Sequence, residues 1–160
     1  MNTALYVGMD VGGSRSRAAV VDAAGVLRGA AEGPGGNPVA HAADRTAAAL
    51  AGTLRSALTG LPGDAVRGLV LGLAGAGTVG PAVVATRLAD LTCAAGLTCR
   101  AEVVGDVVVA FAAGSAGPDG TVLVAGTGAT AARISGRRET EVTDGHGWLV
   151  GDLCVLRSSR

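Results

Sequence analysis

Lysine is absent from this sequence of 160 residues, and all 13 basic side chains are arginines. A phosphate-binding loop of the Walker type needs a lysine that reaches the phosphates, so this kind of loop is excluded. The formal net charge is +0. Neutrality argues against nucleic acid or an anionic membrane as a partner held by bulk charge.

Cysteines are few as well, and the 3 that occur, Cys93, Cys99 and Cys154, form no CxxC pair. An odd number without a disulfide framework is typical of reduced thiols in the cytosol. The first residues lack a basic region followed by an apolar stretch of signal length. No apolar run approaches the ~18 residues that a membrane helix needs. We therefore expect a cytoplasmic protein without a membrane partner.

Apolar residues are abundant, at 49% of the sequence, while charged residues make up 16%. This balance is typical of a globular domain rather than a disordered chain. The length suits one domain, or one domain with a fragment of a second.

The most informative stretch lies near the N-terminus, between two expected strands at Ala4–Met9 and Ala18–Asp22. It contains Asp10 and a turn made of Gly12, Gly13 and Ser14. Consecutive glycines can direct backbone N–H groups toward one centre, which suits phosphate oxygens. A carboxylate at a strand end can hold Mg²⁺. A plain hairpin turn is the alternative, because Gly-Gly is a common hairpin signal.

The apolar pattern predicts a mixed α/β fold. Three strands precede any helix, which is unusual for a doubly wound nucleotide-binding fold. A breaker cluster then leads to Asn37 and Pro38, which suit a helix start. The further elements expected are a helix from about Val39 to Leu58, a strand buried on both faces at Gly68–Ala74, a helix at Pro81–Ala95, a strand at Arg100–Gly105 and a short helix at Val107–Ala113.

Two polar residues stand at positions where either a cap or a ligand contact is expected. Asp106 follows a buried strand and opens a helix, which is the ligand-binding rim of an α/β sheet. Asp is also a good N-cap. Asn37 has the same two interpretations, a helix cap or an amide that binds a ligand hydroxyl. The residues alone leave both questions open.

The opening pattern returns after a linker at Gly114–Gly120. Strands are expected at Thr121–Ala125 and Ala131–Ser135, with the turn Gly126, Thr127 and Gly128 between them. Two such turns facing each other could clamp a polyphosphate from both sides. Arg137–Glu139 is expected to be a solvated turn. The glycine-rich stretch that follows contains Gly145, His146, Gly147, the only tryptophan and Asp152, and its alternation of glycine with polar groups suits a ligand loop.

Taken together, these motifs resemble those of the actin-like sugar kinase and ATPase superfamily. The greatest similarity is to the N-acetylglucosamine kinase group within the BadF/BadG/BcrA/BcrD-type ATPases, and it covers residues 3 to 152. It rests on the order and spacing of six segments, Gly8–Ser14, Gly36–Pro38, Gly72–Gly77, Val104–Asp106, Gly126–Gly128 and Gly145–Asp152.

The resemblance implies an ATP-dependent kinase that phosphorylates an amino sugar such as N-acetylglucosamine on its 6-hydroxyl. Asp10 would position Mg²⁺ in the first phosphate motif with Gly12, Gly13 and Ser14, and Gly126, Thr127 and Gly128 would form the second. Asp106 matches the catalytic base. The positions that match sugar contacts are Asn37, Thr127 and Asp152, helped by Gly145, His146 and Gly147.

The resemblance ends after Asp152, where relatives continue with a Glu-Gly-Ser-Gly type run and a second lobe that carries the adenosine site. It therefore implies an actin-like, ribonuclease H-like lobe over residues 1–114 and the incomplete start of a second lobe over 115–160. We expect a truncated product with impaired turnover. The open sheet edge after Ala125 favours self-association, for instance as a homodimer.

Three other functions remain as alternatives. Gly75–Gly80 is a literal GxGxxG, which would suit a dinucleotide-binding oxidoreductase, although Asp106 follows it by ~26 residues rather than ~20. A BadF-type activator would need cysteines that ligate an iron–sulfur cluster, and neither Cys93 nor Cys99 stands in an evident ligand position. The third alternative is a chain without activity, either a sugar sensor or an inactive fragment.

Overall fold

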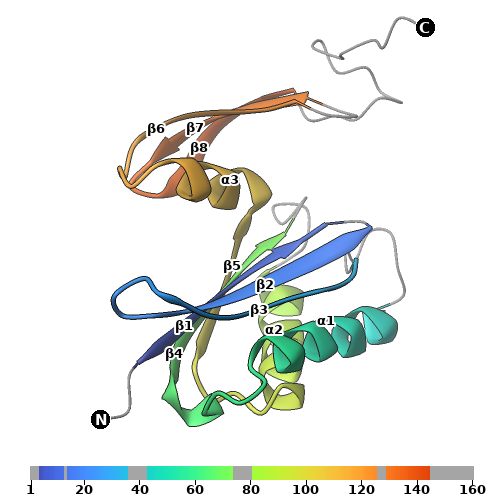
Figure 1. Cartoon of the computed structure of the whole chain (residues 1–160). Helices are drawn as coiled ribbons and strands as arrows, with labels where there is room; N and C mark the ends of the chain where they lie inside the picture. Colours follow the sequence, from blue (N-terminus) through green and yellow to red (C-terminus); the bar gives the residue numbers. More distant parts are fainter. Residues whose placement is uncertain (1–3, 13, 36–42, 74–80, 126–128, 145–160) are drawn as a thin grey trace, which may run out of the picture. The chain divides into compact units, whose positions relative to one another are not determined.

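The computed structural model describes residues 4–12, 14–35, 43–73, 81–125 and 129–144 of the chain (Figure 1). It divides into two compact units, Met1–Asp106 and Val107–Arg160. Both contain a sheet and helix residues, so the predicted mixed α/β class is confirmed.

The first unit is built on a five-stranded sheet with the strand order β3-β2-β1-β4-β5. Strands β1 (Leu5–Val11), β2 (Arg15–Asp22) and β3 (Leu27–Pro34) are antiparallel neighbours. Strands β4 (Val66–Leu73) and β5 (Arg100–Gly105) run parallel to β1. The expected order of three strands before any helix is confirmed, and β1 and β2 both extend further toward the glycine turn than predicted.

One face of this sheet forms the core with helices α1 (Ala43–Ala57) and α2 (Pro81–Ala94), which both lie on that face (Figure 1). Alternate residues of β1 are buried there, because successive side chains of a strand point to opposite faces. A short 3₁₀ helix, η1 (Gly63–Ala65), leads into β4. Arg55 from the last turn of α1 donates a 2.7 Å hydrogen bond to the carbonyl of Ala94, which ties the two helix ends together.

The opposite face of the sheet is more open than the sequence predicts. The apolar run around β4 indicates a strand buried on both faces, but Val70 is 41% exposed. Tyr6 on neighbouring β1 is 45% exposed. Both helices of this unit pack on the other side of the sheet. The helices therefore cover only one face of β4, and the prediction of burial on both faces is wrong at Val70.

Small residues allow β3 and α1 to approach closely. A Cβ atom at Gly29 would collide with the carbonyl oxygen of Ala57, and one at Gly33 would collide with the side-chain oxygen of Thr53. Both glycines lie on the same face of β3, four residues apart, and their partners lie one turn apart on α1. Glycine at these two positions therefore sets how near the helix lies to the edge of the sheet.

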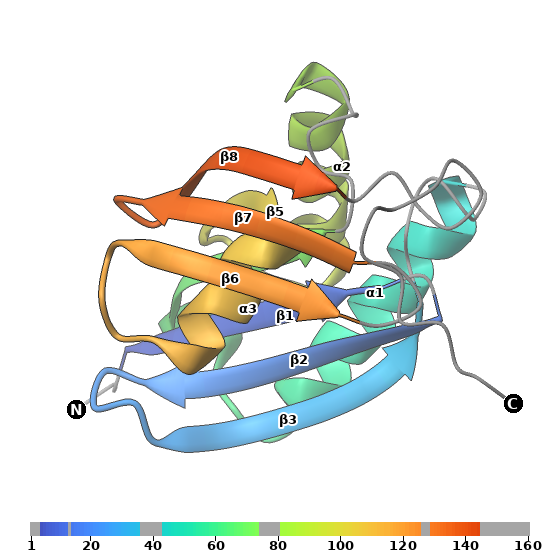
Figure 2. The ribbon, with the colours of Figure 1, turned by 90° about the horizontal axis from the view of Figure 1, so that it is seen from above.

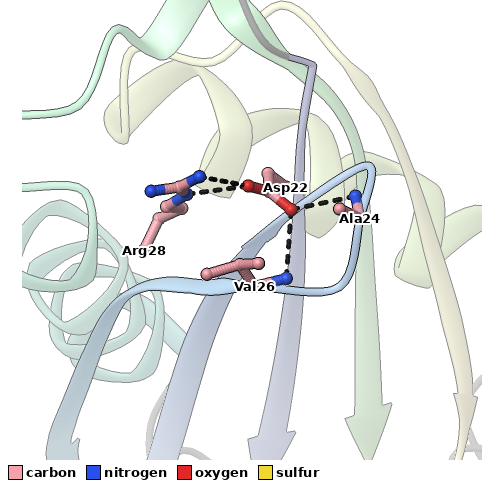
Figure 3. Close-up of polar contacts among 4 residues, drawn as sticks. All are labelled: Asp22, Ala24, Val26 and Arg28. Carbon is pink, nitrogen blue, oxygen red and sulfur yellow. Dashed lines mark hydrogen bonds and ion pairs between the residues drawn. The ribbon is translucent and has the colours of Figure 1, made fainter.

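A buried carboxylate closes the β2–β3 hairpin (Figure 3). Asp22 is 4% exposed and accepts hydrogen bonds from the backbone N–H groups of Ala24 (2.9 Å) and Val26 (3.0 Å). The Arg28 guanidinium donates from Nε (2.8 Å) and also from Nη2. The hydrogen bond from Arg28, followed by that from the Val26 N–H, holds the pKa of Asp22 below its ordinary value.

The second unit contains a three-stranded antiparallel sheet in the order β6-β7-β8, and Figure 2 shows these strands side by side. They are β6 (Gly120–Ala125), β7 (Ala129–Ser135) and β8 (Arg138–Asp144). Helix α3 (Asp106–Gly114) packs Val107 and Phe111 against Ala132 and Ile134. The contacts thus divide the chain after Asp106, whereas the predicted lobe boundary follows residue 114, so the assignment of 115–160 to a second lobe stays a prediction.

The prediction of a solvated turn at Arg137–Glu139 is wrong for its last two residues, which begin β8. The turn itself uses Gly136 (φ 56°) and Arg137 (φ 63°), both in the left-handed region. The Asp119 carboxylate accepts hydrogen bonds from the Gly136 N–H (2.8 Å) and the Ser135 hydroxyl (2.9 Å), and these hold its pKa below the ordinary value. None of the described helices in either unit has both the length and the apolar character to span a bilayer.

Candidate functional site

The carboxyl ends of β1, β4 and β5 lie at one edge of the first sheet, because the three strands are parallel. Asp10 is paired with Gly72, and Gly72 is paired with Val104. Asp106 follows Val104 by two residues, at the start of α3. The structure therefore brings two predicted site residues, Asp10 and Asp106, to the same edge.

Their separation follows from the strand spacing. Neighbouring strands lie ~4.8 Å apart, so the backbones of Asp10 and Val104, with one strand between them, are separated by roughly 10 Å. Asp106 lies two residues further along the chain than Val104. Both side chains are exposed, and Asp106 also belongs to the first turn of α3. A carboxylate there is favoured by the helix dipole. Asp106 is the first residue of the helix, and both its capping and its catalytic role stay predictions.

The glycine turn between β1 and β2 forms a hairpin in its described part. The N–H of Gly12 donates a 3.0 Å hydrogen bond to the carbonyl of Arg15. This amide therefore has a partner within the hairpin, and the assignment of Gly12 to the phosphate site stays a prediction. A Cβ atom at Gly12 would lie 3.1 Å from the same carbonyl oxygen, so a larger residue would strain the turn. Ser14 is exposed at the tip.

Two arginines near this turn are features that the sequence reasoning did not single out. Arg17 is the register partner of Asp10 on β2, and its Nε lies 3.0 Å from a carboxylate oxygen of Glu32. Arg15 reaches the other oxygen of Glu32 at 3.6 Å. The strand period of two, counted from Asp10 through the hairpin, could have indicated that these side chains share one face. That face carries two guanidinium groups beside the carboxylates of Asp10 and Glu32.

The donor set at this edge suits magnesium held together with phosphates. Within the described ranges, no group of three His, Cys, Asp or Glu residues is arranged as a metal cage. Mg²⁺ typically keeps several waters and takes one or two carboxylates plus substrate phosphates. Exposed Asp10 offers an oxygen ligand of that kind. The residues therefore fit Mg²⁺ that arrives with a nucleotide.

Several predicted site residues lie outside the described ranges. These are Gly13, Asn37, Gly126, Thr127, Gly128, Gly145, His146, Gly147 and Asp152, as well as the alternative motif at 75–80. Their flanks are described in part. Ala125 pairs with Ala129, so the two strands predicted on either side of 126–128 are confirmed as antiparallel neighbours. The expected clamp between the two glycine turns involves both units and stays a prediction.

Comparison with known proteins gives similarity in structure only. No family model and no curated protein matches the sequence. A proposed N-acetylglucosamine kinase from Porphyromonas gingivalis superposes with a TM-score of 0.75 at 22% identity, over 92% of this chain and 50% of that one. A second proposed N-acetylglucosamine kinase, from Chromobacterium violaceum, gives 0.70 at 21% identity, over 95% and 52%.

An inorganic polyphosphate/ATP-glucomannokinase from Arthrobacter sp. strain KM has higher identity, 28%, with a TM-score of 0.56 over 86% of this chain and 60% of that one. The fold is that of the actin-like sugar kinases and ATPases, as the resemblance implies. The chain spans about half the length of the two N-acetylglucosamine kinase structures. A shared fold does not by itself assign a reaction, so the chemistry has to be argued from the site.

Proposed function

We propose that the chain supplies the phosphate-binding and sugar-binding residues of an ATP-dependent sugar kinase. The substrate would be an amino sugar such as N-acetylglucosamine, phosphorylated on its 6-hydroxyl. One observation carries the proposal: Asp10 and Asp106 stand at the carboxyl edge of one sheet with a single strand between them. The proposed and named sugar kinases among the similar structures support it.

Two carboxylates at this spacing can divide the work of phosphoryl transfer. Asp106 would accept the proton of the sugar hydroxyl while the hydroxyl oxygen forms a bond to the γ-phosphorus of ATP. The bond from that phosphorus to the bridging oxygen breaks, and ADP leaves with the electron pair. The reaction needs positioning and charge stabilisation more than covalent chemistry from the protein. A general base of this kind typically contributes ~10²–10⁴-fold.

Asp10 would hold the magnesium ion that accompanies ATP, and this ion, when bound, neutralises charge on the phosphates. Ser14, Gly126, Thr127 and Gly128 would contact the phosphates. The Gly12 amide is committed to Arg15, so Gly12 would contribute the tight turn rather than a contact. Sugar contacts are proposed for Asn37, Thr127 and Asp152, with Gly145, His146 and Gly147.

The remaining expectations are part of the same proposal. We propose that residues 1–114 and 115–160 correspond to one lobe and the start of another. We also propose a cytoplasmic location, no nucleic-acid or membrane partner, and self-association such as a homodimer.

The alternative functions are less well supported by the fold. A dinucleotide-binding domain is a doubly wound, mostly parallel sheet, whereas β1, β2 and β3 are antiparallel neighbours here. For a cluster-bearing activator, Cys93 is exposed on α2 and Cys99 is half-buried just before β5. Burial raises the pKa of the Cys99 thiol, which disfavours the thiolate that a cluster requires.

Calorimetric titration of the 160-residue chain with N-acetylglucosamine and then Mg-ATP, alongside a coupled kinase assay, tests the proposal. We expect both ligands to bind. Asp106→Asn should lower turnover by ~10²–10⁴-fold and leave the Mg-ATP affinity within about threefold, because Asp106 contacts the sugar rather than the nucleotide.

Asp64→Asn is the matched control, since Asp64 is exposed in η1, at the amino end of β4 and hence at the opposite edge of the sheet. This variant should behave like the wild type. Absence of binding for both ligands would contradict the proposal. So would a measurable wild-type turnover that Asp106→Asn leaves equal to that of Asp64→Asn.

A further inference from the structure

A buried pair of hydroxyl groups lies directly behind the glycine turn. Ser16 is 0% exposed and Thr53 is 4% exposed. Ser16 Oγ donates a 2.8 Å hydrogen bond to the carbonyl of Pro34, and it lies 3.3 Å from Thr53 Oγ1. These contacts join β2, β3 and α1. We call Ser16 and Thr53 the hydroxyl clasp.

The protons of the clasp can be assigned by counting donors. A serine hydroxyl has a single proton, and that of Ser16 is directed to Pro34. Toward Thr53, Ser16 Oγ can therefore act only as an acceptor. The Thr53 hydroxyl has two acceptors within reach, Ser16 and the carbonyl of Ala49 at 3.1 Å. The backbone ladder already pairs β3 with β2 as far as Pro34. What the Ser16 hydroxyl adds is a side-chain tie from the end of β3 and from α1 to β2.

The two hydroxyls of the clasp pack closely against the backbone of β3 at Gly33. A Cβ atom at Gly33 would collide with Thr53 Oγ1 and lie 3.5 Å from Ser16 Oγ. A buried polar group needs a partner, since its loss leaves a donor or acceptor without compensation. Only a residue without a side chain at position 33 leaves room for the two hydroxyls to meet the strand.

The position of the clasp in the chain connects it to both parts of the proposed site. Ser16 is the register partner of Val11, and this pair closes the hairpin that contains the glycine turn. Pro34 is the last residue of β3, shortly before Asn37 in the sequence. Thr53 belongs to α1, the helix that follows Asn37. One hydroxyl therefore links the phosphate turn to the described flanks on both sides of Asn37.

We infer that Ser16 and Thr53 are positioning residues that fix the strand leading to the sugar contacts against the phosphate turn. The inference rests on the proposed function. The turn itself is held by the backbone ladder between β1 and β2, which does not need the Ser16 side chain. Loss of the clasp should therefore affect the amino sugar much more than the nucleotide.

The first experiment measures both affinities by calorimetry in the 160-residue chain carrying Ser16→Ala. We expect N-acetylglucosamine to bind about tenfold more weakly, the effect of one lost hydrogen bond. The Mg-ATP affinity should change by less than about threefold. Thr53→Val, which removes the hydroxyl but keeps the shape, should weaken sugar binding less, and Thr53→Ser should restore it.

Thr92→Val is the matched control, because Thr92 also donates to the carbonyl four residues earlier, at 2.9 Å, but in α2. It should lower thermal stability without changing the sugar affinity. Equal losses of sugar and nucleotide affinity in Ser16→Ala, or a sugar affinity equal to that of Thr92→Val, would overturn the inference.

A second measurement is independent of any ligand. Amide hydrogen exchange of Ser16→Ala should accelerate in peptides covering the end of β3, relative to Thr92→Val, while peptides covering β4 stay unchanged. Unchanged exchange at the end of β3 would overturn the inference even where both ligands bind. If the wild-type chain binds neither ligand, the proposed function fails, and the exchange result alone decides whether the clasp holds β3.

Discussion

At the scale of single residues, Asp22 has the largest number of hydrogen-bond partners among the described carboxylates, and it lies at the opposite end of the strands from the candidate site. Its carboxylate accepts from two backbone N–H groups and from Arg28. By contrast, the arginines beside Asp10 are more than half exposed where they meet Glu32. Exposed pairs contribute little to stability because water and salt screen them. Asp22 is therefore the carboxylate whose titration should matter for folding.

The pH dependence of stability should report this pairing. The pKa of Asp22 is lowered in the folded chain, so its contribution is fully present above its unfolded pKa of about 4 and is lost as the pH falls through the folded value. In urea unfolding, the difference in free energy between wild type and Asp22→Asn should therefore shrink as the pH drops below about 4.

The pKa of Asp119 is lowered too. Its contribution is the same in the wild type and in Asp22→Asn, so it cancels when their unfolding free energies are subtracted. Arg28→Gln serves as the second variant, because it removes the largest cause of the shift while keeping the carboxylate. In this variant, the loss of unfolding free energy on acidification should begin at a higher pH than in the wild type. A free-energy difference that stays constant from pH 7 to pH 3 would contradict the pairing.

The candidate site is also best judged residue by residue. Asp10 and Asp106 could be predicted to share an edge because strand ends and sheet direction follow from apolar patterning. The commitment of the Gly12 amide to Arg15 could not be predicted, since a glycine pair permits both a hairpin and an anion site. The contact between Ser16 and Thr53 could not be predicted either, because two hydroxyls 37 positions apart in the sequence leave no local pattern.

At the scale of elements, the fit between α1 and β3 depends on glycine in one place and tolerates it in another. Gly29 meets the Ala57 carbonyl, whereas Gly52, within α1, has nothing within 4 Å of where its Cβ would lie. The same chemical change at these two positions should therefore have opposite signs.

Gly52→Ala should stabilise the chain by about 0.5–1 kcal/mol, because alanine is the better helix former. Gly29→Ala should destabilise it by about 1–3 kcal/mol, since the added methyl group overpacks the contact between helix and strand. Urea unfolding of the two variants checks both values, and each serves as the control for the other. Equal shifts of the same sign would show that α1 does not lie this close to β3.

Elements with strong apolar periodicity were predicted well, and weakly apolar ones were not. The helices at Ala43–Ala57 and Pro81–Ala94 were expected, as was the strand at Arg100–Gly105. Strand β8 was missed because Val142 is its only large apolar residue, and because its turn uses Gly-Arg instead of a common hairpin pair. Its pairing with β7 comes from tertiary structure, which no local pattern reveals.

At the scale of the whole molecule, the described residues form two separate apolar cores. One gathers residues of β1, β2, β4, α1 and α2, and the other gathers Val107, Phe111, Ala132 and Ile134. Separate cores should open as separate cooperative units. A cavity made in one should thus leave the amides of the other protected.

Phe111→Ala tests this independence, because truncation of a buried aromatic residue typically costs about 3–5 kcal/mol. We expect amide hydrogen exchange to accelerate throughout β6, β7 and β8 while β1 and β4 stay protected. Leu54→Ala, at a fully buried position of the first core, should give the reverse pattern. Faster exchange in both sheets for either variant would mean that the two units unfold together.

The open face of the first sheet carries a chromophore that can report whether the face is covered. Tyr6 is the only tyrosine of the sequence and stands exposed on that face, on the same strand and the same side as Asp10. Any surface that covers the face, such as a second copy of the chain, moves this phenol from water into an apolar environment. Ultraviolet difference spectroscopy can therefore follow the covering of the face in unmodified protein, without a dye or an added chromophore.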